Sequence, residues 1–299
     1  MKRRRFVLFA VLVAIGPFSG YARDSRAADA AADQPIRALL VIGGGSHDYL
    51  HQKDILVQGL TARANIHIKV AFDPANSRLH PNPVYDDPDW AKGFDVVIHD
   101  ESVGGVTDLK LVDRILKPHR EGLPAVVLHS GMHAYRTEGW PKAVTPWFEF
   151  TGLQTTGHGP QFPIAVRFID PDSPITKGLA DWTTIKEELY NNAAGKLLDT
   201  AHPLARGKQT VKIGPKKANG DDTGSKANGP TKERTDDNIV VWTNLYNGKS
   251  RVFATTLGHN NETVGDPRYL DLVVRGLLWS VDRLDESHLK PAAGGTSSR

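Results

Sequence analysis

Short, mostly apolar runs alternate with helix-like segments through the first half of the chain, and this alternation constrains the fold more than any other feature. Residues 37–45, 94–99 and 124–129 form such runs, and each ends in glycine or histidine, which is typical of buried parallel strands. Residues 53–64 and 108–119 carry apolar side chains at helical spacing. This alternation predicts an α/β fold in which helices cover both faces of a mostly parallel sheet.

The second half of the chain is less regular. Residues 164–170 have the pattern of a strand, and residues 238–243 and 251–257 predict two strands joined by a turn at Asn247 and Gly248. Residues 267–283 place apolar side chains on one helical face and predict a final helix. We therefore expect one large domain over residues 36–284.

One stretch inside this domain, residues 207–237, has a different composition. It is rich in Lys, Gly, Asp and Asn, and the tetrapeptide KANG occurs in it twice. Because so few apolar side chains cannot offset the entropy lost when a chain becomes ordered, we predict a flexible surface insertion there. For residues 285–299 we predict a disordered tail.

The N-terminus has the layout of a secretory signal peptide. Four basic residues at positions 2–5 precede an apolar run over residues 6–18, and small residues follow. The run is shorter than the roughly 20 residues that a membrane-spanning helix needs. We predict a cleaved signal peptide over residues 1–27 and a disordered leader over residues 28–35. The mature protein is then expected to be secreted or periplasmic, without a membrane partner.

The composition excludes several classes of function. The 299 residues include no cysteine, which removes disulfides, thiolate nucleophiles and cysteine-ligated metals. Any metal ion must therefore be held by histidine, carboxylate or backbone oxygen. The net charge of +3 comes partly from the extreme N-terminus, and no basic stripe is present. We expect no nucleic-acid partner.

Histidines at strand ends and beside glycines are the main candidates for chemistry. His129 closes a predicted strand, where related α/β folds place a sharp elbow that presents a side chain to the pocket. It is either a base or metal ligand, or a histidine hydrogen-bonded in the interior, and the local sequence leaves both readings open. His47 follows three glycines and a serine, and His158 and His259 each lie beside a glycine.

Familiar short motifs are weak or absent. His129 and His133 have the spacing of an HExxH zinc site, but the glutamate of that motif is missing. The glycines at positions 43–45 fit neither a GxGxxG nor a Walker loop, so we expect a tight turn and no nucleotide cofactor. A serine hydrolase is disfavoured because the chain has no GxSxG motif.

An ordered set of motifs resembles the ThuA-like (trehalose utilisation) family over residues 36–284. The set comprises ALLVIGGGSHDY, FDVVIHDE, GLPAVVLHSGMHAY, GHGP, DPDSPITKGL, EELYN and RVFATTLGHNNETVGDPRYLDLVVRGLLW. The resemblance implies a flavodoxin-like, class I glutamine amidotransferase-like three-layer sandwich with a mostly parallel central sheet. His129 stands where the amidotransferases carry their cysteine, so glutamine hydrolysis is excluded. The chain departs from the family's usual DELY, because Glu187 and Glu188 both precede Leu189.

The resemblance also implies carbohydrate metabolism, since the family accompanies oxidoreductases that make 3-keto sugars. We expect an enzyme that acts on a (3-keto) disaccharide or glycoside by hydrolysis, elimination or isomerisation. A non-catalytic sugar-binding or scaffold module on the same fold is the alternative. A metal-independent hydrolase, with Glu188 acting on water, is a third hypothesis.

The candidate residues are expected to converge above the carboxyl edge of the sheet. A divalent ion, with zinc the choice for nitrogen and oxygen donors, is predicted to bind His129, His158, Glu188 and His259. The predicted catalytic residues are His129, Glu188, His133 and His47. The predicted contacts with a small carbohydrate substrate are Gly44, Asp48, Tyr135 and His158. Trp140 and Trp147 fit core packing better than sugar stacking.

Overall fold

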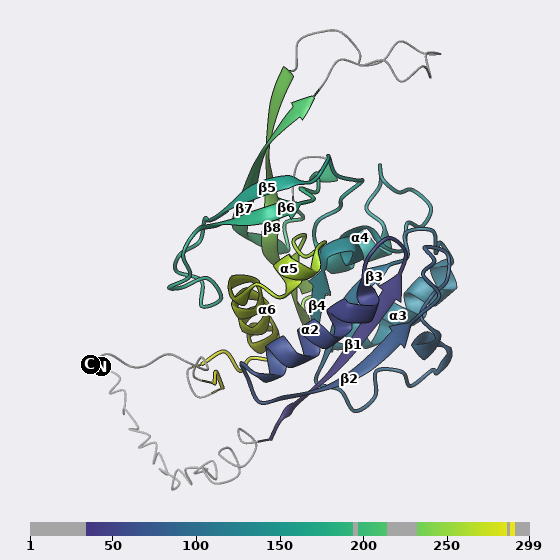
Figure 1. Ribbon diagram of the computed structural model, residues 1–299. Coiled ribbons are helices and arrows are strands. Elements are labelled where there is room, and N and C mark those ends of the chain that lie inside the picture. Colours follow the sequence, from purple (N-terminus) through teal and green to yellow (C-terminus); the bar gives the residue numbers. More distant parts are fainter. Residues whose placement is uncertain (1–33, 194–196, 214–231, 286–287, 291–299) are drawn as a thin grey trace, which may run out of the picture. The chain divides into compact units, whose positions relative to one another are not determined.

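The computed structural model describes residues 34–193, 197–213, 232–285 and 288–290 (Figure 1). All elements named below belong to the unit formed by residues 35–299. The predicted signal peptide and nearly all of the predicted leader lie outside the described residues, as do residues 214–231 of the predicted insertion and most of the predicted tail. Within the described part of the chain, no helix is long and apolar enough to cross a bilayer.

One mixed sheet organises this unit. Its nine described strands lie in the order β2-β1-β3-β4-β9-β8-β7-β5-β6. The parallel half consists of β2 (Ile66–Asp73), β1 (Ile36–Gly44), β3 (Val96–Ser102), β4 (Ala125–Leu128) and β9 (Ser250–Thr255). The antiparallel half consists of β8 (Lys232–Tyr246), β7 (Ala201–Ile213), β5 (Phe162–Phe168) and β6 (Trp182–Glu187). The sheet is therefore parallel at one end only.

The order of the parallel strands determines where a ligand can bind. With β9 counted as the fifth strand, the order is 2-1-3-4-5, as in doubly wound flavodoxin-like sheets. In such sheets ligands bind outside the carboxyl ends of the strands, where the strand order reverses. The loops after β1, β3, β4 and β9 therefore surround one location.

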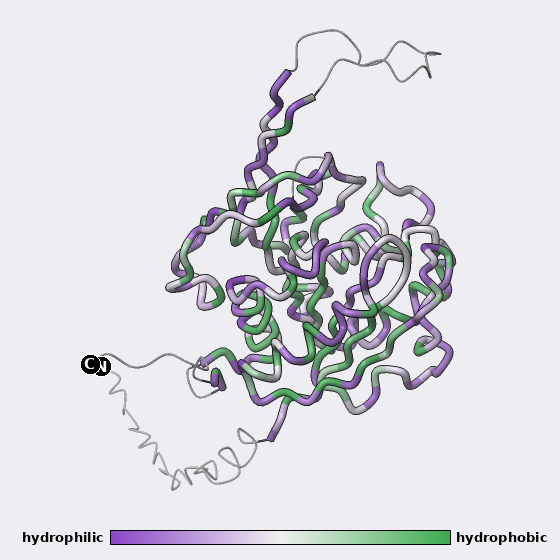
Figure 2. Tube along the Cα trace, viewed as in Figure 1, coloured by the Kyte–Doolittle hydropathy of each residue, from purple (hydrophilic) through white to green (hydrophobic). Residues whose placement is uncertain are grey.

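Two hydrophobic cores lie against the sheet because neighbouring strand residues point to opposite faces. Leu40 of β1 belongs to the core that includes α2 (Tyr49–Thr61) and α6 (Pro267–Ser280). Leu39 belongs to the other core, with α3 (Leu109–Glu121) and α4 (Pro146–Thr151). The central strands are accordingly the most hydrophobic part of the trace in Figure 2. Shorter elements are η1 (Pro83–Asp86), η2 (His129–His133) and α5 (Asn261–Val264).

Two elements extend beyond their predicted bounds. Strand β3 continues past His99 to Ser102, and its buried Glu101 accepts hydrogen bonds from two tyrosine hydroxyls, which makes a carboxylate tolerable inside the protein. Residues 207–213 and 232–237, predicted as flexible, form paired strands of β7 and β8. Backbone pairing supplies these hydrogen bonds without requiring apolar side chains.

Candidate metal centre

The elbow after β4 positions the first candidate ligand. His129 follows Leu128 directly and has a left-handed φ of 42°, which turns its side chain out of the strand. Leu128 pairs with Thr255 of the parallel neighbour β9, so the residues after both strands also meet. Nδ1 of His129 donates to the Thr256 carbonyl oxygen at 2.7 Å. Its Nε2 then carries the lone pair and faces the Tyr190 hydroxyl at 3.2 Å.

The loop after β1 positions the second candidate ligand. Nδ1 of His47 donates to the Gly45 carbonyl oxygen at 3.0 Å. Its Nε2 is buried and has no hydrogen-bond partner among the described residues. Burial, followed by the nearby His129 ring, lowers the pKa of His47 to about 3. The ring is therefore neutral near pH 7, with an unused lone pair on Nε2.

Glu187 and Glu188, at the end of β6, have different roles. The buried Glu187 carboxylate accepts hydrogen bonds from the backbone N–H groups of His259 and Asn260, at 3.2 and 3.1 Å. It therefore ties the turn after β9 to the edge strand β6. Glu188 points the other way, and its Oε2 lies 3.1 Å from Nδ1 of His259 and 3.6 Å from Nε2 of His129.

These side chains form one group, which we call the metal-centre cluster. The ligand atoms of its members lie within 4.8 Å of one another; the members are His47, His129, Glu188 and His259. Burial would raise the pKa of Glu188, but the facing His129 and His259 rings outweigh it and hold this pKa below its usual value. Glu188 is therefore ionised, as a metal ligand must be.

The donor set fits a divalent metal ion. Nδ1 of His259 is buried and, despite the short distance to Glu188, has no aligned hydrogen bond. Nε2 of His47 is likewise unpartnered. Metal-binding histidines usually donate their second ring N–H to a carbonyl or carboxylate, as His47 and His129 do here. Three imidazoles and one carboxylate are donors that zinc and related ions accept.

His158 does not join the predicted ligand set, and His47 takes its place. Nε2 of His158 lies 3.3 Å from Glu188, but His158 is not part of the group of mutually close ligand atoms. Its Nδ1 donates to the Gly159 carbonyl oxygen, and its ring stacks on Tyr190. The stacking leaves the ring beside the carboxylate and outside that group, so the role of His158 as a ligand stays a prediction.

His133 lies in the wall of a cavity that also includes Glu188 and Tyr190, and it is not a member of the metal-centre cluster. Nδ1 of His133 faces the Thr155 hydroxyl at 3.0 Å, and the ring stacks on Tyr190 with centroids 4.6 Å apart. Burial, and then the charge of Arg136, lower the pKa of His133 well below its usual value. The ring is therefore neutral near pH 7.

Two of the predicted substrate contacts, Gly44 and Tyr135, lie outside the two cavities beside the cluster, and Asp48 lines one of these cavities. Gly44 ends β1 with its backbone against that of Ser102, and it is not among the residues that line the cavity. Asp48 is exposed and accepts hydrogen bonds from His51 and Asn261. Tyr135 is fully buried, because its left-handed backbone directs the hydroxyl to Glu101 at 2.9 Å. This burial contradicts the predicted contact between Tyr135 and a sugar.

Two adjoining cavities open beside the metal-centre cluster. The first, of about 310 Å³, includes Glu188 and Tyr190 in its wall, and we call it the inner cavity. The second, of about 550 Å³, is lined by Asp48, side-chain amides and Glu262, and we call it the outer cavity. Ser46, His47 and His259 line both. The cluster therefore stands at the junction of two polar cavities.

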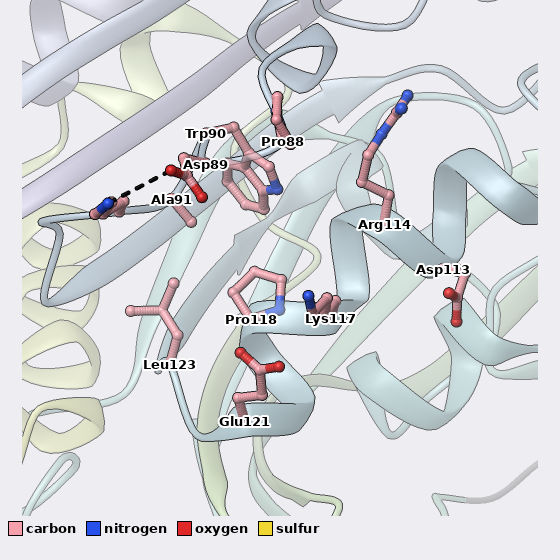
Figure 3. Close-up of a pocket in the computed structure, with 11 residues that line it drawn as sticks. Pro88, Asp89, Trp90, Ala91, Asp113, Arg114, Lys117, Pro118, Glu121 and Leu123 are labelled. Atoms are coloured by element: carbon pink, nitrogen blue, oxygen red, sulfur yellow. Dashed lines mark hydrogen bonds and ion pairs between the residues drawn. The ribbon is translucent and has the colours of Figure 1, made fainter.

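A larger cavity of about 690 Å³ lies apart from this chemistry (Figure 3). It is formed by residues 88–92 and one side of α3, with Trp90 and Pro118 among its walls. None of its lining residues is a histidine, and the ion pair between Lys92 and Asp89 is exposed. Size alone therefore does not identify the candidate site.

Several pocket residues have no signal in the sequence. Arg78 comes from an irregular loop after β2, Arg136 follows His133 by three residues, and Tyr190 follows the glutamate pair in EELYN. Asp100 is buried next to Glu101, and burial, together with that neighbouring charge, raises its pKa to about 8. In the sequence, the burial of Asp100 could have been predicted only if β3 had been expected to continue beyond His99.

Three comparisons relate the chain to known proteins. A catalytic mutant of a GH42 β-galactosidase from G. stearothermophilus aligns with a TM-score of 0.46 and 10% identity, over 87% of this chain and 31% of its own length. The glutaminase domain of Trypanosoma brucei CTPS, with bound acivicin, aligns with a TM-score of 0.38 and 12% identity, over 81% of this chain and 94% of its own. The chain thus spans about a third of the β-galactosidase. A search of curated sequences found no match. Residues 37–280 match the ThuA (trehalose utilisation) family, and the chain therefore belongs to this family.

Proposed function

We propose that the chain is a metal-assisted enzyme that acts on a (3-keto) disaccharide or glycoside by hydrolysis, elimination or isomerisation. Membership of the ThuA family implies a role in trehalose utilisation, and hence in carbohydrate metabolism. The observation that carries the proposal is the metal-centre cluster, whose four ligand atoms lie within 4.8 Å of one another at the junction of two cavities. Buried lone pairs without partners are costly, and a bound cation would satisfy them.

The metal ion has a defined part in this proposal. His47, His129, Glu188 and His259 would hold it, and zinc is the ion we propose. When bound, a divalent ion polarises a carbonyl oxygen or lowers the pKa of water. This chemistry suits a keto sugar, because a polarised carbonyl makes the neighbouring C–H group more acidic.

His158 is the residue best placed to move a proton. Its Nδ1 donates to the Gly159 carbonyl oxygen, so its Nε2 holds the lone pair when the ring is neutral. The side chain is 36% exposed, which allows proton exchange with solvent. Glu188 is ionised and faces three imidazoles, so we assign it the role of ligand and give His158 the role of general acid or base.

The outer cavity is suited to sugar hydroxyl groups. Asp48, Asn76 and Asn261 combine carboxylate acceptors with amides that both donate and accept. We propose that one sugar unit lies there. Its carbonyl group then points to the metal-centre cluster, at His47 and His259, which line both cavities. The three-layer amidotransferase-like sandwich is the proposed scaffold, supported by the strand order and by two cores that include different helices.

We also propose that the protein is exported. The basic residues 2–5 and the apolar run over residues 6–18 support a cleavable signal peptide. Mass spectrometry of the protein recovered from a periplasmic fraction is expected to find a mature chain that begins near residue 28. A full-length chain retained in the cytoplasm would overturn this proposal.

One pair of measurements tests the enzyme proposal. Purified protein is analysed for bound metal and assayed against keto-disaccharides and their parent disaccharides, with and without a chelator. We expect one ion per chain, turnover of the keto sugars only, and loss of both metal and turnover after chelation. His129→Ala should abolish both properties, and His202→Gln, a change at an exposed histidine, should leave both intact.

The non-catalytic module remains the competing function, since the outer cavity could bind hydroxyl groups without turnover. Saturable binding of a disaccharide with no product, in metal-loaded protein, would favour it. Turnover that survives complete removal of metal would instead favour the metal-independent hydrolase with Glu188.

A further inference from the structure

Two arginines in the inner cavity have no part in the proposed chemistry. Arg78 and Arg136 line this cavity together with His133, Glu188 and Tyr190. Burial, and then the like charge of Arg78, lower the pKa of Arg136. Burial lowers the pKa of His133, and the charges of Arg136 and Arg78 lower it further. Both arginines therefore line the same cavity as His47 and His259.

Neither arginine has a carboxylate partner among the described residues. Elsewhere in the described chain, seven arginines form ion pairs with aspartates: Arg37, Arg63, Arg120, Arg206, Arg234, Arg251 and Arg268. Glu188 is the single carboxylate among the residues that line the inner cavity, and its contacts are with histidines. The inner cavity thus has an excess of positive charge even before a metal ion is counted.

The side chain of Arg136 is held so that its terminal groups stay free. Its Nε donates to the His133 carbonyl oxygen at 3.0 Å, and its guanidinium lies 4.3 Å from the centre of the Trp140 ring. No hydrogen bond of its two terminal NH₂ groups is found within the described residues. A guanidinium fixed in this way loses little freedom when it binds an oxyanion.

Two glycines provide the space in which the arginines lie. A Cβ atom at Gly45 would come within 2.7 Å of Cγ of Arg78, and one at Gly104 within 3.0 Å of Nε of Arg136. Each arginine side chain therefore packs against the backbone of a glycine, and a larger residue at that position would occupy its space. A Cβ atom at either glycine would force the neighbouring arginine side chain to move.

We propose that Arg78 and Arg136 form an anion subsite, which binds the carboxylate or phosphate of an acidic sugar. A planar guanidinium binds such oxyanions through paired hydrogen bonds, and two unpaired guanidinium groups in one cavity gain most from a shared anion. The inference deepens the proposed function, on which it rests for the presence of the sugar. The substrate is then an acidic sugar whose anionic group lies in the inner cavity and whose neutral unit lies in the outer cavity.

Binding measurements with a matched set of hexoses test this subsite. Metal-loaded protein is titrated with glucose, glucuronate and glucose 6-phosphate in a calorimeter at fixed ionic strength. We expect at least one of the two acids to bind about 10- to 100-fold more tightly than glucose, as charge-assisted hydrogen bonds predict. Preference for glucuronate identifies a sugar carboxylate, and preference for glucose 6-phosphate identifies a sugar phosphate.

Variants separate the arginines from the metal as the source of this preference. Arg136→Gln and Arg78→Gln are each expected to remove most of it while the metal content stays at the wild-type value. Arg114→Gln, an exposed arginine on α3, should retain it (Figure 3). Arg136→Lys keeps the charge but not the planar fork, so an intermediate preference is expected.

The failure of this inference is distinguishable from failure of the proposed function. Acids that bind no more tightly than glucose, including no binding by any of them, overturn the subsite. A preference that survives in both glutamine variants overturns it as well, because the metal alone would then select the anion. The subsite is tested by binding affinity and not by turnover. An inactive protein that binds an acid more tightly than glucose, and loses this preference in the arginine variants, therefore refutes only the enzyme proposal.

Discussion

The same sheet carries two clusters of histidine and glutamate that differ in one respect. The metal-centre cluster has ring nitrogens without partners, whereas the second, which we call the sealed cluster, consists of His99, His119 and Glu101 with Tyr85 and Tyr135. In the sealed cluster, the two nitrogens of His99 face Glu101 at 3.0 Å and His119 at 3.1 Å. Nδ1 of His119 donates to the Leu123 carbonyl oxygen.

The comparison shows that a structural histidine and a candidate ligand do not differ in residue type. They differ in whether every ring nitrogen has a hydrogen-bond partner. Every ring nitrogen of the sealed cluster has a polar partner, so the cluster offers nothing to a ligand. Its rings are packed among Trp90, Trp147 and Phe150. In the metal-centre cluster, Nε2 of His47 is buried without a partner and two polar cavities adjoin it.

The first prediction, with the strongest consequence, concerns His158, which lies beside the metal-centre cluster without belonging to it. His158→Gln should lower kcat by about 10²- to 10⁴-fold, the usual contribution of a general acid or base. The metal content should not change, because His158 is outside the group of close ligand atoms. Steady-state kinetics and metal analysis measure the two effects. Loss of the metal in this variant would mean that His158 is a ligand after all.

The second effect breaks the sealed cluster. Glu101→Leu leaves two tyrosine hydroxyls and a ring nitrogen of His99 without their acceptor. We expect a loss of about 3–5 kcal/mol in the free energy of unfolding, measured with urea, and an unchanged number of metal ions per folded chain. Glu121→Leu, at the exposed end of α3, should stay within about 0.5 kcal/mol of wild type. Equal stability of the two variants would show that the sealed cluster does not stabilise the fold.

The third effect concerns the support of the metal-centre cluster. Glu187→Gln removes the charge that holds the backbone N–H groups of His259 and Asn260. Metal affinity, measured by competition with a chelator, is expected to fall by about 10- to 100-fold, as for other residues that orient ligands. Glu233→Gln, on an exposed part of β8, serves as the control. An unchanged affinity would assign Glu187 a role in folding alone.

The smallest effect is a pH dependence carried by the sealed cluster. Burial, and then the facing His99 ring, lower the pKa of His119 to about 3, whereas an unfolded histidine titrates near pH 6.5. Between these values the unfolded chain binds more protons, so stability falls as the pH decreases, by about 1.4 kcal/mol per pH unit for this group. His119→Gln should flatten the dependence between about pH 6 and 4.5. The exposed His67→Gln should not, and parallel curves for all three proteins would contradict the assignment.

Much of the parallel half of the fold could be predicted from the sequence. The apolar runs became β1, β3 and β4, because a strand buried on both faces needs apolar side chains almost throughout. His129 could be placed at an elbow because it directly follows such a run. The paired strands within residues 207–213 and 232–237 could not be predicted, since their stability comes from backbone hydrogen bonds that leave no hydrophobic pattern.

The amino-acid sequence alone shows which histidines stand at the carboxyl ends of strands, because strand pattern and strand end are local properties. The folded arrangement of distant segments was needed to show that His47 rather than His158 completes the metal-centre cluster, and that Glu188 reaches it from the far edge strand β6. It was also needed to show that Tyr135 is buried and that Arg78 and Arg136 share a cavity. The physical reason is that a lone pair or a charge is free only when no residue distant in the chain has folded against it.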